Sequence, residues 1–88
     1  MADSGQITIA TAGTAQQGPA TGGLAVAVKA LVGNGGNVYI GNDASADVTS
    51  ANGFELAPGD GVIVKKSLDA FWFDSATNGD GLSWLKIE

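Results

Sequence analysis

The chain has 88 residues, which is enough for one small domain. Its four basic residues are all lysine and are outnumbered by nine acidic residues, so the net charge is −5. Histidine, cysteine and arginine are absent, and with them most side chains used for nucleophilic, acid–base and soft-metal chemistry. Direct nucleic-acid binding is also disfavoured, because it depends on clustered positive charge. We therefore expect a non-enzymatic protein with no catalytic, metal or cofactor site.

The first six residues are small and polar, and we expect them to form a flexible N-terminal end before a single domain over 7–88. Ile7 and Ile9 alternate with smaller residues, which predicts a first strand. The N-terminus lacks the basic and apolar segments of a signal peptide, and Leu24–Val32 is too short to span a bilayer. Synthesis in the cytoplasm, without membrane association, is the expectation.

The segment Thr14–Gly23 is rich in small and polar residues, which indicates a loop or a poorly paired edge. Leu24–Val32 alternates with a period of two and is followed by a glycine-rich stop, which favours a strand over a helix. Asn37–Gly41 predicts another strand, and the glycines between these two strands suggest a hairpin.

A polar excursion over Asn42–Ser50 precedes Phe54–Leu56 and the turn Pro58–Gly61. Further strands are predicted over 62–65, 70–74 and 82–87. Short strands separated by Asn-Gly, Asp-Gly and Pro-Gly turns predict an all-β fold, namely a small antiparallel, jelly-roll-like β-sandwich. Its expected core comprises Val26, Val28, Val38, Ile40, Val62, Val64, Phe71 and Phe73.

Two acidic groups contain the residue types of a chemical site. Asp74–Gly81 has the oxygen donors of a calcium loop, but Ala76 occupies a ligand position and no bidentate glutamate follows, so a hairpin turn is the better interpretation. Asp43 and Asp47 form a carboxylate pair of the kind that glycosidases use, but their surroundings indicate solvated loop acids.

The aromatic residues suggest an interaction surface. In Phe71-Trp72-Phe73 the two phenylalanines share one face, and Trp72 on the other either covers a second buried surface or binds a partner such as a sugar. Trp84 shares a face with Leu82 and Lys86, whereas Leu85 and Ile87 point the other way. Apolar side chains on both faces of this strand suggest a subunit interface.

Seven short segments stand in a characteristic order along the chain: Thr11–Ala15, Lys29–Leu31, Gly36–Gly41, Asp47–Phe54, Leu56–Asp60, Phe71–Asp74 and Gly79–Leu85. This order resembles that of a family of small structural proteins of tailed bacteriophages. The similarity covers roughly residues 7–87, with Phe71-Trp72-Phe73 departing from the Ile-Tyr-Val type of segment at that place.

The resemblance implies a virion component, without catalytic residues, that decorates or cements the outside of the capsid. The implied partners are the major capsid protein and further copies of the chain, because a small domain without disulfides gains stability by association. The segment Thr14–Gly23 is then expected to order against the capsid. A tail-fibre or baseplate domain that binds a carbohydrate or receptor is the alternative. The candidate interface residues are Gln16, Gln17, Trp72, Leu82, Trp84 and Lys86.

Overall fold

The computed structural model describes residues 3–41, 48–49 and 51–88. Within them the chain is all-β, as expected, with antiparallel strands and one short 3-10 helix, η1. The elements are β1 (Ser4–Thr8), β2 (Gln16–Gln17), β3 (Val26–Ala30), β4 (Val38–Gly41), β5 (Phe54–Leu56), β6 (Gly61–Val64), η1 (Leu68–Ala70), β7 (Trp72–Ser75) and β8 (Gly81–Lys86).

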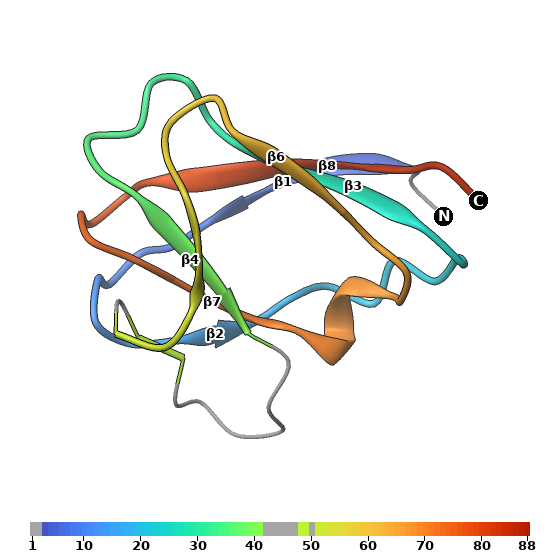
Figure 1. Cartoon of the computed structure of the whole chain (residues 1–88), viewed down its shortest axis with the longest axis horizontal. Helices are drawn as coiled ribbons and strands as arrows, with labels where there is room; N and C mark the ends of the chain where they lie inside the picture. The colour runs from blue at the N-terminus through green and yellow to red at the C-terminus, as the bar shows by residue number, and fades with distance from the viewer. Residues whose placement is uncertain (1–2, 42–47, 50) are drawn as a thin grey trace.

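The strands form two four-stranded sheets that pack as a sandwich. Sheet A has the order β1-β8-β3-β6 and sheet B the order β2-β7-β4-β5. Figure 1 shows the strands of sheet A together above β2, β4 and β7 of sheet B. The first strand pairs with the last, the second with the seventh, the third with the sixth and the fourth with the fifth. This nested pairing is that of a long hairpin folded into two sheets.

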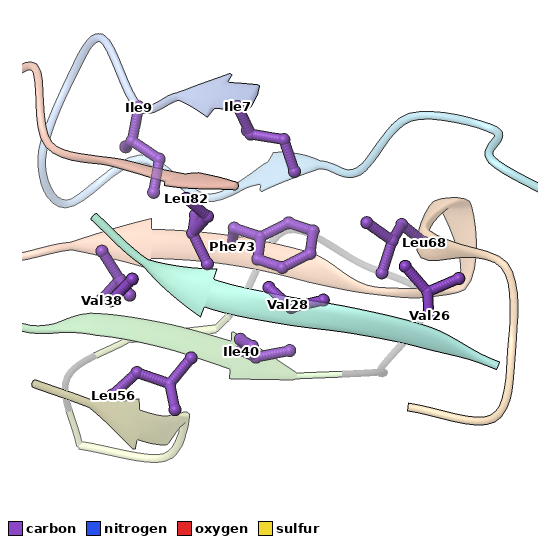
Figure 2. Packing of buried hydrophobic residues seen from close by; sticks show 11 residues of the cluster. Ile7, Ile9, Val26, Val28, Val38, Ile40, Leu56, Leu68, Phe73 and Leu82 are labelled. Carbon is purple, nitrogen blue, oxygen red and sulfur yellow. The ribbon is translucent and has the colours of Figure 1, made fainter. Parts of the chain in front are cut away.

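The core lies between the sheets and consists of inward-facing residues that alternate along the strands, together with Ile9 and Leu68 outside them. Phe73 of sheet B lies at its centre, among labelled side chains from both sheets (Figure 2). Five of the eight predicted core residues are buried, and the other three pack against the cluster while staying half-buried. The buried five are Val26, Val28, Val38, Ile40 and Phe73, and the half-buried three are Val62, Val64 and Phe71.

Two predictions about the chain path are wrong. Ser4, Gly5 and Gln6 are not a loose end, because they belong to β1 and pair with β8. The predicted hairpin of Leu24–Val32 with Asn37–Gly41 does not form, since β3 lies in sheet A and β4 in sheet B. The glycine-rich segment between them therefore crosses from one sheet to the other. Both strands present apolar faces to the same core, and alternation alone does not distinguish this arrangement from direct pairing.

The segment Thr14–Gly23 is held by hydrogen bonds and is not a free loop. It contains the two-residue edge strand β2, the poorly paired edge that was expected. Beyond β2, the Gly18 N–H donates to the carbonyl of Phe71 at 3.0 Å. The buried hydroxyl of Thr21 accepts from the Leu68 N–H at 3.1 Å. These bonds fix the segment against η1, so it is ordered within the chain itself, and its contact with a capsid stays a prediction.

Candidate interaction surface

The outer face of sheet B is covered by the chain itself. Tyr39 projects from β4 on this face, yet it is only 7% exposed because Ala15, Val48 and Trp72 pack around it. Gly53 also lies over Tyr39: a Cβ atom at residue 53 would stand 2.6 Å from the Tyr39 Cβ. Ala15, Val48, Gly53 and Trp72 thus close this side of the sandwich over Tyr39.

The outer face of sheet A has no such cover in the described residues. Leu85 of β8 lies opposite Ala27 of β3, which lies opposite Ile63 of β6. Directly opposed residues of antiparallel strands share a face, so these three form a continuous apolar row across three strands. We call them the outer row. Ile63 is 58% exposed and Leu85 is 54% exposed.

The outer row borders a shallow hollow of about 650 Å³. Ala27, a small residue, lies between the larger side chains of Ile63 and Leu85, and Gly61 leaves space beside Ile63 in the neighbouring row. Exposed Lys29 also lines it. Such a surface fits a protein partner that offers an apolar side chain and a nearby carboxylate.

Of the three predicted interface residues of β8, Trp84 is among the residues that line the hollow, whereas Leu82 and Lys86 are not. Leu82 is fully buried in the core, so its assignment to an interface is wrong. Trp84 faces inward, packs against the core, and lies over Gly5 of β1, whose Cβ position is 3.1 Å from the indole ring. The Lys86 ammonium lies 3.3 Å from the Asp3 carboxylate in a partly exposed ion pair.

The other three predicted interface residues lie on sheet B, away from the outer row. Gln17 is exposed on β2 opposite Trp72, and its side-chain amide donates to the Asp69 carbonyl at 2.8 Å. Gln16 is half-buried and lies opposite Phe73. Trp72 is half-buried against the Tyr39 cluster, which agrees with its predicted covering role and leaves less of the indole ring for stacking on a sugar.

The acids of the predicted turn Asp74–Gly81 accept backbone hydrogen bonds. The Asp80 carboxylate accepts the N–H groups of Gly35 and Gly36 at 2.9 and 3.0 Å. Asp74 accepts the N–H of Gly13 at 2.9 Å. Both carboxylates therefore fasten loops, and the described residues contain no group of three or more potential metal ligands. The pair Asp43 and Asp47 lies outside the described residues.

The sequence did not predict that Ile63 and Ala27 lie on the surface. For Leu85 it predicted only that the side chain points to the opposite face from Leu82 and Trp84. The available signal was the presence of apolar residues on both faces of 82–87. It showed that one apolar face would be exposed or covered by a partner, but not which one. The pairing of β8 with β3 decides this, because Leu82 and Trp84 lie opposite the inward-facing Ala30 and Val28.

Comparison of the chain with protein-family models, curated proteins and solved structures gave no match. In the part of the chain that the structure describes, no helix has the length and apolarity needed to cross a membrane.

Proposed function

We propose that this chain is a non-enzymatic structural protein of a tailed-bacteriophage virion, which binds the outside of the assembled head and stabilises it. The resemblance over residues 7–87 supplies the class of protein. The observation that carries a binding role is the open outer row on sheet A. One face of the sandwich is closed by its own loops, whereas the other exposes Leu85 and Ile63 beside an apolar hollow.

In this proposal the partner is the major capsid protein, and the outer row is the surface that meets it. Burying one large aliphatic side chain contributes about 1.5–3 kcal/mol. A capsid lattice presents the same contact many times, so modest individual contacts add up through effective concentration when copies are linked. The lysine beside the hollow selects an acidic neighbour on the shell.

The test is co-sedimentation of the purified protein with heads of the parent phage that lack it. Leu85→Asp places a charge in the outer row without touching the core, and we expect binding to weaken by about 10- to 100-fold. Val32→Asp is the matched control, because Val32 is 72% exposed but lies outside the outer row. Equal binding by both variants would show that the outer row is not the surface that binds the head. Absence of binding by the native chain would reject the head role.

Cryo-electron microscopy of the parent virion separates this function from its alternative. Density for the chain on the head surface supports decoration. Density restricted to the tail tip would replace the proposal with a fibre or baseplate role.

A further inference from the structure

Strand β6 is an open edge of sheet A. It pairs with β3 on one side and has no strand on its other side among the described residues. The Ala30 N–H donates to the carbonyl of Asp60 at 2.9 Å, so the backbone at residue 60 points toward β3. Backbone groups of successive residues point to opposite sides of a strand. Those of Gly61 and Ile63 therefore point to the free edge.

Natural edge strands are normally blunted by charge, proline or a covering segment, because an apolar edge templates further pairing. The four residues of β6 are Gly-Val-Ile-Val and contain none of these protections. Charges occur only just beyond its two ends, at Asp60 and at Lys65 and Lys66. This arrangement favours a specific partner strand with complementary ends.

We propose that two copies of this chain associate through β6, antiparallel about a two-fold axis at Ile63. In this register Ile63 lies opposite Ile63 of the second copy, and Val62 lies opposite its Val64. The free backbone groups of Ile63 then bond across the axis, and sheet A continues into a sheet of twice the width. A two-fold contact of this kind closes after two copies.

Charge complementarity selects this register. When the strand register is continued beyond the two ends of β6, through the bend at residues 65–66, exposed Asp60 lies opposite exposed Lys66 of the second copy, and symmetry repeats the pair at the other end. One oxygen of Asp60 accepts the Ala57 N–H at 3.2 Å, which leaves the other carboxylate oxygen for the lysine. A shift by two residues moves Lys66 opposite Val62 or Pro58, and the charge pairs are lost.

The same register joins the apolar surfaces of the two copies. The outer row of one copy meets that of the other at Ile63, so the two rows become one continuous surface. On the inner side an apolar cleft of about 230 Å³ lies between the edges of the two sheets. Its lining includes Phe54, Val62 and Val64, which an added strand at β6 would shield from water.

The doubled outer row deepens the proposed function, and this consequence rests on that function: one dimer would offer two shell contacts at once. The dimer itself is measured without capsids, so its failure and the failure of capsid binding are distinguishable.

The first experiment measures self-association of the whole chain by sedimentation velocity and native mass spectrometry, from micromolar to millimolar concentration. Lys66→Asp places carboxylates opposite each other at both ends, and we expect the dimer Kd to rise about tenfold or more. Lys65→Asp is the matched control, because residue 65 lies opposite Gly61 and the same charge change removes no pair. A chain that stays monomeric to millimolar concentration overturns the proposal, as does equal weakening by both variants.

Mixing two variants adds a gain-of-function test. Asp60→Lys and Lys66→Asp each carry like charges opposite each other in a homodimer, but together they form two opposite-charge pairs. We expect the heterodimer to exceed both homodimers at least tenfold in abundance, and a random mixture would contradict the register. Thermal melts check Asp60→Lys for folding, because Asp60 also holds the turn.

The second experiment uses the absence of cysteine from the chain. Residues directly opposite in a sheet have Cα atoms about 5.5 Å apart, within the range that a disulfide spans. Ile63→Cys is therefore expected to crosslink under mild oxidation at least tenfold faster than Val32→Cys, which is also exposed. Equal rates would overturn a two-fold axis at Ile63.

Discussion

At the scale of single residues, close approach decides which side chains the sandwich tolerates. Gly53 passes directly over Tyr39, and this contact helps to close the outer face of sheet B. A side chain at residue 53 would compete with Tyr39 for the same space. The covered face of the molecule thus depends on a position where only hydrogen fits.

We expect Gly53→Ala to lower the free energy of unfolding by about 1–3 kcal/mol, because the new Cβ stands too close to the Tyr39 Cβ and the loop must shift. Thermal unfolding followed by circular dichroism measures this as a fall in Tm. Gly33→Ala is the control, because nothing lies within 4 Å of its Cβ position. A fall of the same size in both variants would show that close packing at Tyr39 is not the cause.

At the scale of elements, buried polar groups fasten the crossings between the sheets. The segment that leads from β3 to β4 is bonded to the turn before β8 through Asp80 and through Asn34. The Asn34 side chain both donates to the Gly81 carbonyl and accepts from its N–H, each at 2.9 Å. The glycine-rich segment does not form a hairpin, and these bonds hold it in place instead.

Asp80→Asn tests this fastening with almost no change in shape. One carboxylate oxygen becomes an amide NH₂ that faces a backbone N–H, so a part-buried donor loses its acceptor. Leaving such a group unsatisfied costs about 1–3 kcal/mol. Urea denaturation should show the loss, while Asp69→Asn, at an exposed residue whose carboxylate has no hydrogen bond among the described residues, should unfold like the native chain. Unchanged stability of Asp80→Asn would mean that the loop repacks without its bonds.

At the scale of the whole molecule, the sandwich is asymmetric. Sheet B is closed by its own loops, and sheet A presents the outer row and the β6 edge to its surroundings. A domain of this size buries a modest fraction of its surface when alone. Association through the open side is therefore expected to add stability to the folded state.

This expectation has a direct thermal consequence. If the native chain dimerises, its Tm rises with protein concentration, because the dimer forms only from folded copies. We expect an increase of a few degrees between micromolar and millimolar protein, measured by scanning calorimetry. We expect the Tm of Lys66→Asp to rise less with protein concentration than the Tm of the native chain. A native Tm that does not change with concentration would argue against the β6 contact.

The alternation of residues by itself determined much of this protein. It predicted an all-β chain and identified Val26, Val28, Val38, Ile40 and Phe73 as core residues, because a period of two assigns each side chain to a face of its strand. The lack of histidine, cysteine and arginine likewise limited the chemistry from composition alone. These properties are local, so they can be predicted without knowing which strands meet.

Only the tertiary structure decided which strands pair and which apolar face is covered. The first strand pairs with the last, across nearly the whole chain, and no local pattern encodes so distant a partner. In β8, Leu82 and Leu85 are equally apolar, and the register with β3 buries the first and exposes the second. The residues that share one face of a strand follow from the local sequence. The strands that pair are instead determined by shape and hydrogen bonding between distant segments. The candidate surface depends on this pairing.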